Sequence, residues 1–260
     1  MKRPLILVTN DDGINAPGIA ALVSVARELG EVIVVAPDSP QSAQGHAITV
    51  AGPLRIKQVD PFDGLEAYEC SGTPVDCVKL AKQVILKDRT FDFCVSGINH
   101  GSNSATNILY SGTMSAAMEA SLEGVDSIGF SLLDYEWEAD FGPSLPYVRQ
   151  IMEDMLKEGL SNTKLLNVNI PHLPADEIKG IKVCRQAEAR WVEAYEALED
   201  PRGKMMYWLT GEFRNDDPGT DTDVYALENG YVSVVPSGHD LTKYDAIAPM
   251  KRLEKRSSHV

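Results

Sequence analysis

The sequence predicts an α/β protein with a Rossmann-like, doubly wound and mostly parallel sheet, extended by a C-terminal β-hairpin. Three observations predict this class. Short apolar runs alternate with segments of helical periodicity through the first half of the chain. Polar loops rich in Asp, Ser, Asn and Gly follow several of these runs, as they do at the carboxyl ends of parallel strands. Two aromatic-rich segments around a turn come late in the chain and are typical of a hairpin.

The N-terminal segment predicts a βαβ unit. Residues 5–9 form an apolar strand, and residues 17–29 carry apolar side chains at helical spacing before Gly30 ends the helix. Residues 31–36 then form a buried strand of the parallel type, which Pro37 terminates. We expect the crossover between the two strands to be right-handed.

The next segment predicts short strands and a capped helix. Residues 47–50, 54–59 and 66–70 are expected to be short strands that belong to an inserted hairpin. Thr73 is predicted to be the N-cap of the following helix, because Pro74 suits the first helical position.

The remaining core elements are predicted from further apolar runs and helical periods. The predicted strands are residues 91–96, 125–132 and 165–170, and the predicted helices are residues 114–122 and 146–156. We expect a Rossmann-like core over residues 1–185 and a C-terminal arm and tail over residues 186–260.

Residues 190–195 and 204–209 flank a turn and predict a long β-hairpin in that arm. A two-stranded hairpin is only marginally stable by itself, so it must pack on the core or on another subunit. We favour another subunit, which predicts a homo-oligomer. A final strand is expected over residues 231–236, followed by a short tail.

Net charge, cysteine spacing and the length of the apolar runs argue against several classes of protein. The chain of 260 residues has a formal net charge of −14, which disfavours binding to a nucleic-acid polymer. Its four cysteines show no CxxC spacing, which favours a reducing compartment. No apolar run is long enough to span a membrane, and the N-terminus does not resemble a signal peptide. We therefore expect a cytoplasmic protein.

The segment Asn10-Asp11-Asp12-Gly13 is the strongest functional signal, because it follows the first predicted strand directly. Two adjacent carboxylates repel one another unless a positive group lies between them. A divalent cation is the usual partner, since Mg²⁺ and Mn²⁺ prefer oxygen ligands. The alternative is a solvated turn, because Asp and Gly are ordinary turn residues.

Two further loops are expected to reach the same edge of the sheet. Ser42 follows the second strand, and Asn99 follows a later one. Their hydroxyl and amide oxygens are hard donors, and the absence of Cys and His from this set disfavours zinc. The predicted metal ligands are Asp11, Asp12, Ser42 and Asn99.

Ser111-Gly112-Thr113 comes immediately before a predicted helix and forms a candidate anion site through its free backbone N–H groups. Asn99 and Asn103 are placed to donate hydrogen bonds to a phosphoryl group. A metal beside such a site is suited to hydrolysis of phosphate esters. Ser-Gly-Thr is also a common N-cap, so the alternative is a purely structural turn. No GxSxG motif is present, which argues against a serine nucleophile.

Five short motifs, in this order, resemble the SurE family of stationary-phase survival proteins, which are 5′-nucleotidases. They are Val-Thr-Asn-Asp-Asp-Gly (8–13), Val-Val-Ala-Pro-Asp (34–38) with a Ser four residues on, Ser-Gly-Thr-Pro-Val-Asp-Cys-Val (71–78), Val-Ser-Gly-Ile-Asn-His-Gly-Ser-Asn (95–103) and Tyr-Ser-Gly-Thr-Met-Ser-Ala-Ala (110–117). Each motif is short, but their joint order is specific.

The resemblance implies a phosphomonoesterase that acts on nucleoside 5′-monophosphates and needs one divalent metal ion, Mg²⁺ or Mn²⁺, per subunit. It assigns the metal to Asp11, Asp12, Ser42 and Asn99. It maps the phosphate pocket onto Asn99, Asn103, Ser111, Gly112 and Thr113. It also implies dimers or tetramers formed through the C-terminal arm.

The resulting hypothesis is that an activated water attacks the phosphorus in line, with Asp11 or Asp12 as proton acceptor. Nucleoside 3′-monophosphates and polyphosphate are further candidate substrates for the same site. Two alternatives stay open at this point. Asp11 or Asp12 could itself be phosphorylated, or the protein could bind nucleotide and metal as a non-catalytic sensor.

Overall fold

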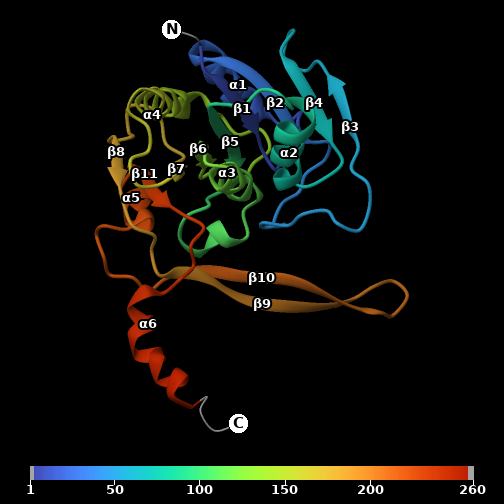
Figure 1. The fold of residues 1–260 in the computed structure, drawn as a ribbon. Helices are drawn as coiled ribbons and strands as arrows, with labels where there is room; N and C mark the ends of the chain where they lie inside the picture. The colour runs from blue at the N-terminus through green and yellow to red at the C-terminus, as the bar shows by residue number, and fades with distance from the viewer. Residues whose placement is uncertain (1–2, 257–260) are drawn as a thin grey trace.

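A computed structural model describes residues 3–256 of the chain (Figure 1). Its central sheet has nine strands in the order β3-β4-β2-β1-β5-β6-β7-β11-β8. The strands are β1 (Leu5–Thr9), β2 (Glu31–Pro37), β3 (Ile56–Val59), β4 (Glu66–Cys70), β5 (Phe93–His100), β6 (Asp126–Leu132), β7 (Leu165–Ile170), β8 (Ile181–Val183) and β11 (Val232–Ser237).

The middle of the sheet is parallel, and only its flanks contain antiparallel pairs. β4, β2, β1, β5, β6 and β7 pair in parallel, whereas β3 pairs antiparallel with β4 and β11 antiparallel with β7. From β1 the chain first builds outward through β2 and β4, and then returns to β5 on the other side of β1. The order of strands therefore reverses between β1 and β5, where ligands bind in open α/β sheets.

Helices cover both faces of the sheet. Successive side chains of β1 point to opposite faces, so its residues show which helices pack on each face. The helices of the core are α1 (Pro17–Leu29), α2 (Pro74–Leu80), α3 (Gly112–Leu122) and α4 (Leu145–Glu158). Ile6 and Val8 lie in the core cluster that includes α1 and α4. Leu5 and Leu7 lie in the cluster that includes α2 and α3. The predicted doubly wound α/β class is thus confirmed.

The capped helix is also confirmed. Thr73 accepts a hydrogen bond from the backbone N–H of Asp76, and the Asp76 carboxylate accepts one from the Thr73 N–H in return. This reciprocal pair is a capping box. α2 continues as a π-helical turn over Ala81–Ile85.

One predicted strand is wrong. Residues 47–50 are irregular, because their backbone groups bond to the start of α2 rather than to a neighbouring strand. The Thr73 hydroxyl donates to the Ala47 carbonyl at 2.7 Å, and Asp76 accepts from the Thr49 N–H at 3.1 Å. The other two predicted strands form the antiparallel pair of β3 and β4.

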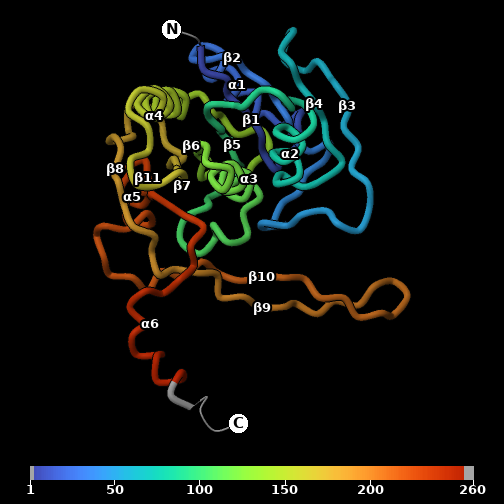
Figure 2. The backbone as a smooth tube through the Cα atoms, viewed as in Figure 1, coloured from blue at the N-terminus to red at the C-terminus, as the bar shows by residue number. Residues whose placement is uncertain are grey.

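The hairpin consists of β9 (Ala189–Glu199) and β10 (Met205–Asn215), which pair with one another and with no other strand of residues 3–256. It extends well beyond the body of the molecule as a long ribbon (Figure 2). The predicted hairpin is therefore present, and it is longer than the aromatic segments alone indicated.

The C-terminal part contains elements that the sequence patterns do not predict. They are β8, α5 (Asp223–Glu228) and α6 (Tyr244–Met250), the last of which lies where a short tail was expected. β11 lies inside the main sheet between β7 and β8, although it comes after the hairpin in the chain. The division of the chain near residue 185 stays a prediction. Within residues 3–256, no helix combines the length and the apolar character needed to cross a membrane.

Candidate active site

The candidate site lies at the carboxyl ends of β1 and β5, where the strand order reverses. Asp11 and Asp12 follow β1, and Asn99 and His100 are the last residues of β5. The loop after β2 joins them, because the Gln41 N–H donates to the Asp11 carbonyl at 2.8 Å. Sequence-distant loops therefore converge at this edge, as the parallel topology predicts.

Asp11 is a buried carboxylate with only 4% of its surface exposed. The Thr113 hydroxyl donates a hydrogen bond to its Oδ1 atom. Burial raises the pKa of Asp11 to about 6, and the neighbouring charge of Asp12 adds to the increase. The folded chain thus holds a carboxylate whose charge is costly until a cation lies beside it.

Asp12 is held by the ring of His100. The Nδ1 atom of His100 lies 3.0 Å from Asp12 Oδ2, and this hydrogen bond raises the pKa of His100 above its ordinary value. The ring stacks on Trp137 with centroids 5.5 Å apart and meets the edge of Phe141 at 5.1 Å. These contacts restrict the imidazole, so Asp12 has a fixed neighbour.

Asn99 is oriented by its own amide hydrogens. Its Nδ2 atom donates to the carbonyls of His100 at 3.0 Å and Gly101 at 2.8 Å. Both N–H bonds are used in this way, which leaves Oδ1 as the free end of the side chain. Oδ1 lies 3.4 Å from the Thr113 hydroxyl, on the side of Asp11. Asn99 therefore presents an oxygen donor to the site.

The N-terminus of α3 packs directly against Asp11. Ser111 caps the helix by accepting from the Met114 N–H at 3.0 Å. A Cβ atom on Gly112 would lie 2.6 Å from the Cβ of Asp11, so only glycine permits this approach. The close approach brings the first turn of α3 and its free N–H groups to the carboxylate.

Asn103 is fixed by a buried amide network. Its N–H donates to Asn169 Oδ1 at 2.7 Å, and its carbonyl accepts from Asn167 Nδ2 at 2.9 Å. Its Nδ2 atom donates to the Ser131 hydroxyl at 2.8 Å. The network commits one of the two amide hydrogens that a phosphate group would use and holds the side chain in place.

A cavity of about 900 Å³ opens over these residues. Asp11, Ser42, Asn99, Asn103 and Ser111 contribute to its lining. Asp12, Gly112 and Thr113 are not lining residues but contact them, Asp12 through His100 and the other two through Asp11. The structure thus brings all the predicted site residues together around one cavity.

The comparisons with known proteins identify the family. Residues 6–193 match the family described as "Survival protein SurE". This chain belongs to the SurE family. The relative from Christiangramia forsetii, named 5′-nucleotidase SurE, is 59% identical over 248 residues, which cover 95% of each chain. The relative of the same name from Flavobacterium psychrophilum is 56% identical and covers 95% of this chain and 96% of its own.

A solved structure also belongs to this family. The crystal structure of the SurE protein from Aquifex aeolicus superposes with a TM-score of 0.84 at 41% identity. The match covers 96% of this chain and 100% of that one. The SurE resemblance seen in the short motifs therefore extends over nearly the whole fold.

The donor set of this SurE chain fits a hard divalent cation. Residues 3–256 contain no group of three or more His, Cys, Asp or Glu side chains suited to a metal ion. The predicted set instead combines two carboxylates with a hydroxyl and an amide oxygen, which suits Mg²⁺ or Mn²⁺ better than zinc. Because the pKa of Asp11 is raised, a positive charge beside it would stabilise the ionised carboxylate.

Several residues around the SurE site are not predicted by the sequence patterns. The pattern at His100 indicates only a turn, although its position next to Asn99 is a signal. The cavity wall also takes Tyr135 from the loop after β6 and Arg190 and Trp191 from the hairpin. No local pattern links the hairpin to Asp11, because the two line one cavity only through the way the chain folds back about 180 residues later.

Proposed function

We propose that this chain hydrolyses nucleoside 5′-monophosphates to nucleoside and phosphate, using one divalent cation per subunit. The relatives named 5′-nucleotidase SurE supply the reaction class, and the chain is an enzyme of that class. The observation that carries the metal requirement is the buried Asp11 carboxylate beside Asp12, with the Thr113 hydroxyl in contact with both Asp11 and the amide oxygen of Asn99.

The proposed ligands of Mg²⁺ or Mn²⁺ are Asp11, Asp12, Ser42 and Asn99. When bound, the cation polarises a phosphoryl oxygen and lowers the pKa of a water molecule. Asp11 and Asp12 come from a single tight loop, and His100 and Thr113 orient them. The carboxylates are therefore preorganised rather than assembled by the substrate.

The protein's own residues provide the phosphate pocket. The first turn of α3, formed by Ser111, Gly112 and Thr113, offers the phosphoryl oxygens a helix N-terminus and the backbone N–H groups that Asp11 does not already engage. Asn103 adds an amide held by its buried network. Asp11 or Asp12 is the proposed proton acceptor for the attacking water.

The test is phosphate release from a panel of nucleoside 5′- and 3′-monophosphates and polyphosphate, with EDTA, Mg²⁺ or Mn²⁺ added in turn. Release that EDTA abolishes and a cation restores supports the proposal, and the panel ranks the substrates. Folded protein that binds nucleotide with a cation but releases no phosphate would favour the sensor instead. A phospho-aspartate trapped by rapid quenching would favour an Asp nucleophile.

We also propose that the β9–β10 hairpin packs on a second copy of the chain, giving a dimer or tetramer. Large apolar side chains are exposed along it, including Tyr195, Leu198, Tyr207 and Trp208. An exposed apolar surface of this kind is typical of an interface between proteins. The cytoplasmic location expected from the sequence stays a prediction.

A further inference from the structure

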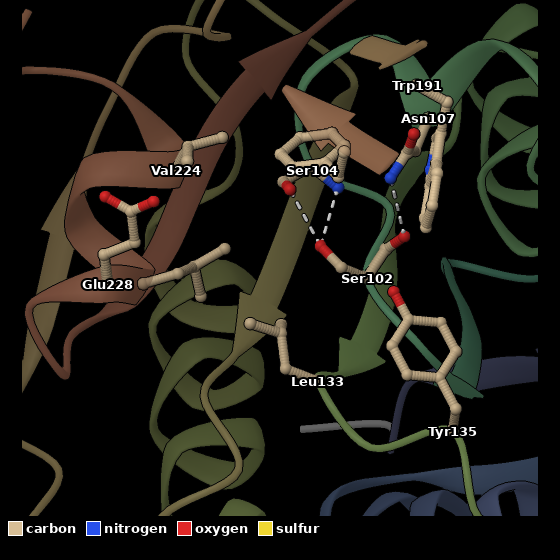
Figure 3. Close-up of a pocket in the computed structure, with 10 residues that line it drawn as sticks. Ser102, Ser104, Asn107, Leu133, Tyr135, Trp191, Val224 and Glu228 are labelled. Carbon is tan, nitrogen blue, oxygen red and sulfur yellow. Dashed lines mark hydrogen bonds between the residues drawn. The ribbon is translucent and has the colours of Figure 1, made fainter. Parts of the chain in front are cut away.

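A second, smaller cavity of about 350 Å³ adjoins the candidate active site (Figure 3). The two cavities share Ser102, Asn107, Tyr135 and Trp191 in their linings. Ser102 also precedes Asn103, a predicted phosphate ligand, in the chain. A molecule whose phosphate lies at Asn103 and Ser111 therefore reaches the second cavity without leaving the protein surface.

The walls of this second cavity are apolar and aromatic. Trp191 and Phe213 meet edge to face with centroids 6.0 Å apart, and Tyr135 lines both cavities. Half-exposed aromatic faces of this kind stack well on flat heterocycles. The volume is at the lower end of the range for small-molecule sites.

Charge decides which end of a nucleotide fits here. Among the described lining residues, the one ionisable acid or base that is charged at neutral pH is Glu228 of α5. No lining Lys or Arg is present to offset it, so a phosphate group would be repelled. The cavity is therefore suited to an uncharged ring, and the phosphate is directed to the N-terminus of α3.

The polar groups of this cavity lie on opposite sides of it. Figure 3 shows Glu228 on one side and Asn107 with Trp191 on the other. The Ser102 hydroxyl bonds to Ser104, and Asn107 Nδ2 donates to the Ser102 carbonyl at 3.4 Å. Glu228 is exposed to solvent, and within residues 3–256 its carboxylate makes no hydrogen bond or ion pair. It is a solvent-accessible acceptor on the α5 side of the cavity, opposite Asn107 and Trp191.

We propose that this cavity is the nucleobase subsite and that Glu228 makes it favour guanine. Guanine offers two neighbouring N–H donors, at N1 and at the 2-amino group, to the two oxygens of one carboxylate. Hypoxanthine lacks the 2-amino group, and adenine has no hydrogen at N1. This inference rests on the proposed nucleotidase function and adds a substrate preference to it.

The experiment compares kcat/KM for GMP, IMP, AMP and ribose 5-phosphate in the wild-type chain and in Glu228→Gln. Wild-type protein is expected to favour GMP over IMP about tenfold, because a charged hydrogen bond depends on the 2-amino group. Glu228→Gln is expected to bring the GMP to IMP ratio close to one. If Glu228 supported only folding, the substitution would lower kcat/KM equally for every substrate and leave the GMP to IMP ratio unchanged.

The matched control is Glu153→Gln, an exposed residue of α4 that lines neither cavity. This substitution should leave kcat/KM for all four substrates at the wild-type level. Equal kcat/KM for GMP and ribose 5-phosphate in the wild-type chain would overturn the subsite. A GMP to IMP ratio that Glu228→Gln does not change would overturn the role of Glu228.

A binding measurement separates this inference from the proposed function. If no substrate releases phosphate, the nucleotidase proposal fails, and calorimetry with guanosine and inosine then tests the subsite directly. Tighter binding of guanosine than of inosine, lost in Glu228→Gln, supports the subsite. No binding of either nucleoside, or equal binding of both, overturns it.

Discussion

The first strand of the sheet and the hairpin contribute to one cavity in opposite ways. Every residue of β1 is buried, whereas in β9 only the first residue, Ala189, is buried. β1 lies between two parallel neighbours, while β9 has β10 as its one partner. Yet Asp11 at the end of β1 and Trp191 near the start of β9 line the same cavity.

This difference shows how the molecule divides its tasks. Carboxylates must be held close together for the proposed chemistry, and a strand packed on both faces fixes them. The hairpin has no core of its own and keeps its shape through main-chain pairing, which leaves its side chains free to contact other molecules. We expect changes at β1 to affect catalysis and changes at β9 to affect substrate contact and assembly.

Asp11→Asn tests the β1 side most severely. Removing one charged ligand should lower kcat/KM by about a thousandfold or more, because the metal and the attacking water both depend on this position. Phosphate release measured with saturating Mn²⁺ checks the expectation. A folded Asp11→Asn protein with near wild-type turnover would refute the assignment of Asp11 as a ligand.

The same substitution should stabilise the protein in EDTA. Asp11 has a pKa of about 6 when folded and an ordinary value of 3.8, so the folded state prefers the protonated form. The contribution of Asp11 to the free energy of unfolding is therefore fully present below about pH 4 and is lost as the pH rises through 6. At pH 7 the asparagine should restore about 3 kcal/mol, because that is the free energy equivalent to the difference between these two pKa values. Melting temperatures at pH 4 and pH 7 check this, and an equal change at both would contradict it.

Gly112→Ala tests the contact between α3 and β1. The added Cβ would lie 2.6 Å from Asp11 Cβ and 2.8 Å from its Oδ2, so the carboxylate or the helix must move. A movement of this size should lower kcat/KM by about a hundredfold. Gly52→Ala is the matched control, because nothing lies within 4 Å of its added Cβ. Equal activity in the two variants would show that the packing is not needed.

The hairpin side is tested by deleting residues 190–210. Ala189 is then followed by residues 211–214, which return the chain to Asn215, its partner in the native ladder. The cavity loses five lining residues, Arg190, Trp191, Glu193, Leu209 and Thr210. Apolar contact with the nucleoside should fall, lowering kcat/KM about tenfold. Metal dependence should persist, because Asp11 and Asn99 are untouched.

The same deletion tests assembly. If the hairpin joins copies of the chain, light scattering should show monomers. Deleting only residues 197–207 separates assembly from substrate contact, because it removes Leu198 and Tyr207 of the proposed interface and keeps the residues that line the cavity. An unchanged oligomer after the larger deletion would refute the hairpin as the interface.

The core was more predictable from the sequence than the outer parts of the site. Apolar runs and Asp-Gly loops locate β1 and its carboxylates, because a buried parallel strand needs continuous apolar side chains. The same logic failed at residues 47–50, where backbone groups bond to Thr73 and Asp76 instead of to a strand. Local patterns do not show such long-range partners.

The position of the hairpin at the cavity could not be predicted from the sequence either. Its aromatic segments predicted a long hairpin, and the pairing of β9 with β10 confirms it. The contact of Trp191 with the cavity depends on the path of the chain through β8 and on the connection to β9. That path is a property of the tertiary fold, and no periodicity records it.

The smallest expected effect concerns the loop that carries Ser42. Glu119 of α3 is buried, with 5% of its side chain exposed, and it bonds to His46 of that loop at 2.9 Å as well as to Lys79. Glu119→Gln keeps the shape of the side chain but weakens both contacts. We expect the loop to move more freely and the Mn²⁺ concentration for half-maximal activity to rise about threefold.

The matched control is Glu123→Gln, in which the same substitution breaks a pair with Lys82 at the end of α3. Both glutamates pair with a lysine of the adjoining helical segment, but only Glu119 reaches the loop of Ser42. A rise in the Mn²⁺ requirement in Glu119→Gln alone would place His46 and Glu119 among the positioning residues of the site. An equal rise in both variants would show instead that the helix pairing, and not the loop, sets the metal requirement.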